Sequence, residues 1–305
     1  MRGWWQDLTD LVLPAECGGC GAPRTVLCPR CRAALGGGAP RRVRPVPEPA
    51  GLPVVHAAAP YAQEVRALLL AHKERGALTL TGALGAALAG AVRAGLTSGE
   101  RSHPDTAAGA CGAGAAAGAG PAAGPVLLVP VPSARWAVRA RGHDPVRRMA
   151  LAAAGRLRTA GTPARVVPVL RQRRRVADQA GLGARERREN LAGALEVVAG
   201  GARLLDGGRV VLVDDLITTG ASLAEAARAL REAAGRRHRI QDRVNGAVYE
   251  AVTREGRWEQ STGSRSERGK RVHGAPGMRV PQVAGEAPRA AVIAAPPDSF
   301  EINRN

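Results

Sequence analysis

Two adjacent carboxylates, followed by a short run of small and hydroxyl residues, are the residues of this sequence whose types and spacing best suit chemistry. Residues 210–222 read VVLVDDLITTGAS, so four aliphatic residues lead directly into Asp214 and Asp215. A continuous aliphatic run predicts a strand buried on both faces, as in a parallel sheet. The two carboxylates then fall where the strand leaves the sheet at its carboxyl edge, which is where open α/β sheets bind their ligands.

The segment after the acidic pair has the composition of an anion-binding loop. It runs into an Ala- and Leu-rich pattern over residues 223–234 that predicts a helix. Exposed backbone N–H groups and the helix dipole favour a phosphate at such a start, while the carboxylates can accept hydrogen bonds from a diol, so the combination suits a sugar phosphate. The alternative is an ordinary strand, turn and helix with an acidic N-cap, although a cap needs only one such residue. A Walker P-loop is excluded because the Gly-Lys-Ser/Thr sequence is missing. The residues expected to hold the phosphate are Thr218, Thr219, Gly220, Ala221 and Ser222.

Four of the five cysteines form two closely spaced pairs near the amino terminus. Cys17, Cys20, Cys28 and Cys31 have the spacing C-x2-C-x7-C-x2-C. Each pair can form a knuckle, and four thiolates complete a tetrahedral Zn²⁺ site with no position open for catalysis. The spacing therefore predicts structural zinc, with redox or disulfide chemistry and an iron–sulfur cluster as the alternatives.

The stretch at 210–222 resembles the PRPP-binding signature of type I phosphoribosyltransferases, and together with the four-cysteine knuckle it resembles the ComF family, which includes the ComFC and GntX types. The resemblance implies a type I phosphoribosyltransferase-like parallel sheet flanked by helices, plus a small amino-terminal zinc-binding module. It implies that Asp214 and Asp215, the catalytic residues, bind the ribose hydroxyls of PRPP. It also implies that residues 218–222 wrap the 5′-phosphate and that Mg²⁺ accompanies PRPP.

Two further segments carry the same resemblance. Residues 129–132, Val-Pro-Val-Pro, and the Arg-Gly of residues 141–142 resemble a family strand that ends in Pro-x-Pro and is followed by Arg-Gly-Phe-Asn-Gln, although here His-Asp-Pro replaces Phe-Asn-Gln. The residues at 179–190 resemble the family's Gln-x-x-Leu and Arg-x-x-Asn block, expected on the flexible loop and hairpin over the site. In the family, the segment that bears Lys73 lies near the substrate. The residues assigned to the pyrophosphate and the flexible loop are Arg135, Arg139, Arg141, Gln179, Arg188 and Asn190.

The residues of these segments also allow simpler interpretations. The strand at 126–129 ends in prolines that favour a turn, so it predicts a second carboxyl-edge loop facing the same crevice, where guanidinium groups would suit a diphosphate. A solvated basic helix face is the alternative for Arg135, Arg139 and Arg141. A charged mobile loop is the alternative for residues 171–175, Arg187 and Arg188. His143 is expected to be a surface or capping residue rather than a general base.

The chain divides by composition into several parts. Residues 1–35 are expected to form a helix and the zinc knuckle, and residues 36–53, rich in Gly, Pro and Arg, a linker. The phosphoribosyltransferase-like domain is expected at 54–235 plus 290–300, with a low-complexity insertion at 97–124. Residues 236–289 are polar and basic without a clear period, and are expected to be a disordered insertion. The sequence further predicts strands at 54–58, 166–170 and 290–295, and helices at 61–72, 78–96 and 149–158.

Composition limits the possible partners. Lysine and arginine total 44 residues, and aspartate and glutamate total 26, so the formal net charge is 44 − 26 = +18. This charge favours a polyanionic partner such as nucleic acid or a phosphorylated metabolite. We expect no membrane span, because the most apolar stretch, at 82–95, is too short, and we expect a cytoplasmic location. The leading functional interpretation is transfer or recognition of 5-phosphoribose with loss of pyrophosphate. The alternatives are a PRPP sensor without turnover, or an accessory of DNA uptake that binds single-stranded DNA or a DNA-processing partner. The acceptor and the oligomeric state are not predicted.

Overall fold

The computed structural model describes residues 16–100, 124–174, 183–258 and 288–301. The described chain separates into two units, one ending at Leu230 and completed by residues 288–301, the other beginning at Arg231. The sheet and the candidate site belong to the first unit. Gln179, Leu182 and Cys111 lie outside the described residues, as does most of the predicted insertion at 97–124.

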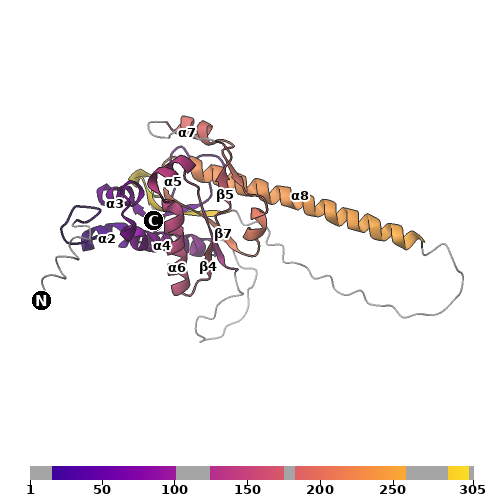
Figure 1. Cartoon of the computed structure of the whole chain (residues 1–305), viewed down its shortest axis with the longest axis horizontal. Coiled ribbons are helices and arrows are strands. Elements are labelled where there is room, and N and C mark those ends of the chain that lie inside the picture. Colours follow the sequence, from indigo (N-terminus) through magenta and orange to yellow (C-terminus); the bar gives the residue numbers. More distant parts are fainter. Residues whose placement is uncertain (1–15, 101–123, 175–182, 259–287, 302–305) are drawn as a thin grey trace. The chain divides into compact units, whose positions relative to one another are not determined.

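A six-stranded sheet forms the centre of the first unit (Figure 1). One of its two edge strands is antiparallel to its neighbour, and all other pairs of neighbouring strands are parallel. The chain is therefore an α/β protein with a mixed, mostly parallel sheet flanked by helices, as the aliphatic runs predict. In spatial order the strands are β1 (Arg41–Val43), β2 (Val55–Pro60), β8 (Arg289–Ala295), β7 (Arg209–Leu216), β3 (Val126–Pro130) and β4 (Ala164–Val166).

The direction of winding reverses between β3 and β7. From β3 the chain proceeds outward to the edge strand β4, whereas from β7 it proceeds in the opposite direction to β8. Such a reversal leaves a crevice at the carboxyl ends of the two central strands, where open sheets bind ligands. The strand that carries the acidic pair and the strand that ends in Pro-x-Pro are therefore neighbours at this point of the fold.

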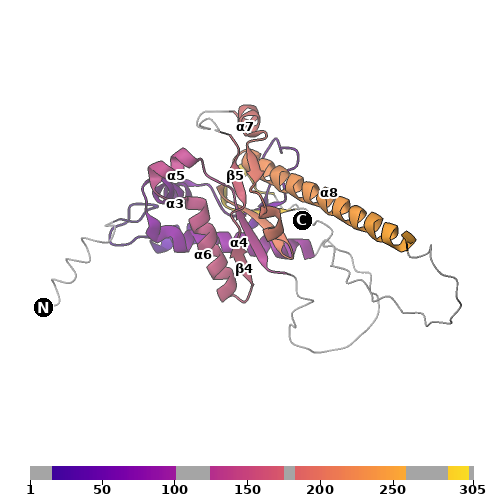
Figure 2. The ribbon, with the colours of Figure 1, turned by 45° about the vertical axis from the view of Figure 1, so that its right-hand side comes forward.

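Both faces of the sheet are covered. Val126 and Leu128 of β3 belong to a continuous core with α4 (Thr81–Glu100) and α6 (Pro145–Thr159), which pack against each other (Figure 2). Leu127 and Val129, which point to the opposite face because side chains alternate along a strand, are also fully buried. A right-handed connection from β7 to β8 places the start of α8 (Ala221–Trp258) on this second face.

Helix α4 is long and apolar enough to cross a membrane when judged by length and composition alone. Among the described residues one such stretch is found, Leu78–Ser98, and half of it is buried inside the structure. It contains Arg93 and packs on α6, β2 and β8. Its apolar character is accounted for by its position against the sheet.

A two-stranded antiparallel sheet stands apart from the central one. β5 (Leu170–Gln172) pairs with β6 (Leu195–Val197), and α7 (Ala184–Leu191) lies between them in the sequence. Residues 183–190, the described part of the block at 179–190, therefore lie in the connection between two paired antiparallel strands. Arg174 secures this connection, because its Nη2 donates to the carbonyl oxygens of Asn190 and Ala192 at the end of α7, at 2.8 and 3.0 Å.

The remaining elements differ from the sequence prediction mainly in extent. The segment predicted as a linker contains β1, and helix α8 continues to Trp258, within the range predicted as a disordered insertion. In the second unit, Glu232 and Arg236 form an ion pair one turn apart, at 3.2 Å. The other described elements are α2 (Pro29–Gly36), α3 (Gln63–Glu74), α5 (Arg135–Arg141) and the short 3-10 helices Leu78–Leu80, Gly201–Leu205 and Pro297–Ser299.

Candidate functional site

The two aspartates lie near the carboxyl end of β7, and a lysine far away in the sequence contacts one of them. Lys73, in the last turn of α3, donates a hydrogen bond from Nζ to Asp215 Oδ2 at 2.8 Å. The backbone N–H of Asp215 donates to Asp214 Oδ1 at 2.9 Å. Asp215 is buried, with 8% of its surface exposed, whereas Asp214 is partly exposed. The acidic pair therefore has one carboxylate that is paired with a cation and a second that is partly exposed.

The surroundings push the pKa values of the two carboxyl groups apart. Burial and the charge of Asp215 raise the pKa of Asp214 well above its ordinary value. Burial also acts to raise the pKa of Asp215, but the charge and hydrogen bond of Lys73 lower it below its ordinary value. The charge of Asp215 in turn raises the pKa of Lys73. A neutral carboxyl group can donate as well as accept a hydrogen bond, so the pair can address both hydroxyls of a diol.

The second carboxyl-edge loop begins beside the acidic pair. Pro130 of β3 lies opposite Val213 of β7, and the N–H of Val131 donates to the Val213 carbonyl at 2.9 Å. The Val-Pro-Val-Pro turn thus leaves the sheet next to the point where Asp214 follows Val213. The structure brings together the two loops that the sequence assigns to ribose and to pyrophosphate.

The predicted phosphate loop has the shape of a tight turn before a helix. Gly220 has a φ of 73°, a conformation that favours glycine, and a Cβ there would lie 3.0 Å from the side chain of Leu52. Its carbonyl oxygen accepts the N–H of Ala224 at 2.9 Å, and Thr219 Oγ1 lies 3.5 Å from the N–H of Ala221. Helix α8 starts at Ala221, so its first N–H groups are available at this loop.

Among the arginines of α7, the structure directs Arg187 rather than Arg188 to the phosphate loop. Arg187 Nη1 donates to Thr218 Oγ1 at 3.2 Å, while its Nε is buried and has no hydrogen-bond partner in the part of the chain that the structure describes. Arg188, the residue selected from the sequence, is exposed, and Asn190 presents its backbone carbonyl to Arg174. An arginine that contacts the loop and still has an unused donor is suited to an anionic oxygen.

The arginines assigned to pyrophosphate occupy different environments. Arg141 forms a two-pronged ion pair with Glu74, with its Nε and Nη2 donating at 2.9 and 2.7 Å. Arg135 and Arg139 are exposed on α5. The ion pair places Arg141 beside the last turn of α3, although the two residues are 67 positions apart in the sequence. Arg135 and Arg139 instead form an exposed basic helix face.

The expectation that His143 is a surface or capping residue is wrong. His143 is buried, with its Nδ1 3.0 Å from the Arg141 carbonyl oxygen and its Nε2 3.3 Å from the His72 carbonyl oxygen. The cap of α6 is Asp144, which accepts the N–H of Arg147 at 3.1 Å. Both ring nitrogens lie near carbonyl oxygens, and a neutral ring can donate to one of them. The contact with His72 joins residues 71 positions apart, so no local sequence pattern marks it.

The lowered pKa of the buried His72 side chain predicts a specific pH dependence of stability. Burial, and then the neighbouring His143, lower the pKa of His72 from 6.5 to about 4. Because the unfolded chain takes up this proton first, the stabilising contribution is complete above pH 6.5 and is lost as the pH falls from 6.5 toward 4. Between pH 7 and pH 4.5, the loss of the free energy of unfolding measured in urea should therefore be about 2 kcal/mol smaller in His72→Gln than in the wild type.

The exposed His238 provides the control for this experiment. His238→Gln should retain the full pH dependence of the wild type, because the change removes an imidazole without altering the environment of His72. Equal pH dependence in the wild type and in His72→Gln would contradict the assignment.

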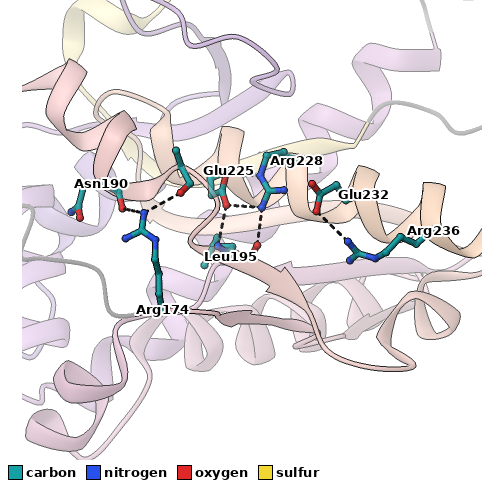
Figure 3. A network of polar contacts seen from close by, with 8 residues as sticks. Arg174, Asn190, Leu195, Glu225, Arg228, Glu232 and Arg236 are labelled. Atoms are coloured by element: carbon teal, nitrogen blue, oxygen red, sulfur yellow. Dashed lines mark hydrogen bonds and ion pairs between the residues drawn. The ribbon is translucent and has the colours of Figure 1, made fainter.

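A polar network that the sequence analysis missed connects the hairpin to α8 (Figure 3). Glu225, which is 6% exposed, accepts the N–H of Leu195 at 3.0 Å and both prongs of Arg228 at 2.7 and 2.8 Å. Arg228 also donates to the Leu195 carbonyl at 2.8 Å. The helix that begins at the phosphate loop and the hairpin that carries α7 are therefore fixed to each other. No local signal marks these residues, since a Glu and an Arg three positions apart are common on exposed helix faces.

No family model matches the sequence, and no curated protein matches it.

The four cysteines of the paired motif converge on one point. All four Sγ atoms lie within 4.8 Å of one another, and no disulfide joins them. The Zn–S distance of about 2.3 Å in a tetrahedral site requires sulfurs about 3.8 Å apart, close to the 3.5 Å between Cys20 and Cys28. The residues thus fit a structural metal such as zinc, the cofactor expected from the spacing.

The backbone around the cluster has the amide donors that thiolates need. The N–H groups of Cys28 and Cys31 donate to the sulfurs of Cys17 and Cys28, both at 3.4 Å. Burial acts to raise the pKa of Cys17, but backbone N–H groups lower it to about 6, whereas burial raises the pKa of Cys31. Three of the four residues belong to the core that includes Leu68 in the middle of α3, so a metal here would support the packing of α3.

Proposed function

We propose that this chain is a PRPP-binding protein of the phosphoribosyltransferase type, related to the ComF family, that transfers or recognises 5-phosphoribose. The observation that carries the proposal is the position of Asp214 and Asp215. They lie near the carboxyl end of a central parallel strand at the reversal of the winding, with an anion-type loop after them and the Pro-x-Pro turn of β3 beside them. A ribose diol, a 5′-phosphate and a pyrophosphate would each find a matching set of groups there.

Each set of groups has a defined task in this proposal. The acidic pair accepts the ribose hydroxyls, and the loop at 218–222 with Arg187 takes the 5′-phosphate. Pyrophosphate lies at the turn that follows Pro130, with Arg141 within reach once it leaves Glu74. Mg²⁺ would enter with PRPP and supply further neutralisation of the pyrophosphate.

Catalysis in such a site would consist of displacement at the anomeric carbon. The bond from C1 to the pyrophosphate oxygen breaks, its electron pair leaves with pyrophosphate, and a lone pair of the acceptor forms the new bond to C1. The protein contributes positioning and charge stabilisation rather than a covalent intermediate. The acceptor is not specified by the residues described above.

The test is calorimetric titration of PRPP with Mg²⁺ into the wild type and into the Asp214→Asn/Asp215→Asn variant. We expect saturable binding by the wild type and at least ~100-fold weaker binding by the variant, because amides replace the carboxylates that accept the diol. Asp206→Asn, which makes the same change ahead of β7, is the matched control and should bind as the wild type does. A wild type that does not bind PRPP would overturn the proposal.

The net charge of +18 favours a second candidate, a cytoplasmic DNA-uptake accessory that binds single-stranded DNA. Phosphate contacts would give steep salt dependence. Salt-sensitive DNA binding that survives loss of both aspartates would support this role. Pyrophosphate release that requires a second substrate would support the enzyme, and PRPP binding without release would support a sensor.

A further inference from the structure

The last turn of α3 contacts both carboxyl-edge loops through three consecutive residues. The His72 carbonyl lies 3.3 Å from His143 Nε2, Lys73 binds Asp215, and Glu74 accepts both prongs of Arg141. Two of these contacts involve the end of α5 and the residues that follow it, and the third involves the acidic pair of β7. The end of α3 is therefore held both at α5 and at β7.

Lys73 is confined by this arrangement. It is followed by the ion pair of Glu74 and preceded by the fully buried His72, whose Nε2 lies 3.0 Å from Thr81 Oγ1. Its own side chain is about one-third exposed, and its partner Asp215 is almost entirely buried. If the ammonium group of Lys73 were removed, the buried carboxylate of Asp215 would lose the charge that compensates it.

We propose that Lys73 is a positioning residue of the sugar-phosphate site, which acts by holding the Asp215 carboxylate charged and in place for a ribose hydroxyl. This inference rests on the proposed function. With Lys73 present, Asp215 is neutralised and Asp214 is free to face the ligand, so a polyanionic sugar phosphate meets an acidic pair with little net charge. Without Lys73, two adjacent carboxyl groups would compete for one proton, and Asp215 would lose the group that orients it.

The experiment compares binding of ribose 5-phosphate and of PRPP with Mg²⁺ to the wild type, Lys73→Met and Lys73→Arg. We expect Lys73→Met to lower the affinity for both ligands by the same factor, roughly 10-fold or more. Lys73→Arg should restore the affinity to within about 3-fold of the wild type. Arg66→Met removes the same charge from an exposed position of α3 and should bind both ligands like the wild type.

A double-mutant cycle separates positioning through Asp215 from other roles. Lys73→Met should add no further loss of affinity in the Asp215→Asn background, because its effect passes through that carboxylate. Thermal unfolding of each variant with and without ligand shows whether the variant is folded. If Lys73→Met is not folded, the comparison of Lys73→Arg with the wild type remains available.

Three results would overturn the inference. Unchanged affinity of Lys73→Met for both ligands would show that the ion pair is irrelevant to binding. A loss confined to PRPP would mean that Lys73 contacts pyrophosphate directly, and additive losses in the double variant would exclude action through Asp215. A wild type that binds neither ligand would overturn the proposed function itself, and this inference with it.

Discussion

Replacing Cys31 by serine is expected to abolish zinc binding and to lower the free energy of unfolding by about 4 kcal/mol or more. Cys31 is fully buried, and its sulfur lies within 4.8 Å of the other three. A serine hydroxyl is a poor ligand for zinc, and two of the three remaining thiols, those of Cys17 and Cys28, would stay in the core shared with Leu68 without a metal to bind them. The measurements are zinc content of the purified protein, expected at one equivalent in the wild type, and urea unfolding.

The fifth cysteine provides the matched control. Cys111→Ser makes the same chemical change outside the four-cysteine motif, so it should retain one equivalent of zinc and the unfolding midpoint of the wild type. A metal chelator should lower the stability of the wild type and of Cys111→Ser but leave Cys31→Ser unchanged. One full equivalent of zinc in Cys31→Ser would rule out the four-sulfur site.

The elements that the sequence predicts well are those with a strong local pattern. Residues 210–213 form part of β7 because four consecutive aliphatic residues can be buried on both faces of a parallel strand. β8 matches the strand expected at 290–295, where the family resemblance implies a last strand after some fifty intervening residues and where Val292 and Ile293 supply apolar side chains. The knuckle follows from spacing alone, since ligand geometry fixes the distance between cysteines.

The elements that the sequence did not predict depend on tertiary partners. β1 is three residues long within a segment rich in Gly and Pro, and it exists because β2 supplies its hydrogen bonds. The predicted strand at 166–170 is divided between β4 and β5, which pair with different sheets. No periodicity distinguishes these cases, because each strand is too short to show one.

The candidate site shows the same division. The acidic pair and the predicted phosphate loop are contiguous in the sequence, so the sequence alone identifies them as one motif. The ligand that they bind stays a prediction. The pairing of Lys73 with Asp215 spans 142 positions, and the contact of Arg187 with Thr218 spans 31. Which of two adjacent arginines faces the loop depends on the rotation of α7 on its hairpin, and a single sequence does not determine that rotation.

Replacing Gly85 by alanine is expected to lower the free energy of unfolding by about 3 kcal/mol. Gly85 lies where α4 crosses α6, and a Cβ there would come within van der Waals overlap of the Ala152 side chain and 3.0 Å from the backbone of Ala152 and Ala153. Because the obstacle includes backbone, neither helix can relax by a rotamer change. Both helices pack on the sheet that carries the acidic pair, so separating them also strains β3 and β7.

Gly82→Ala makes the same substitution one turn earlier in α4, at an exposed position with nothing within 4 Å of the added Cβ. That variant should be more stable than the wild type by about 0.5–1 kcal/mol, because alanine has the higher helix propensity. Opposite signs for the two variants in urea unfolding would show that close approach of α4 and α6 requires glycine at 85. If Gly85→Ala were also stabilising, the two helices would have to lie farther apart than the structure places them, and the core between them would have to be packed in another way.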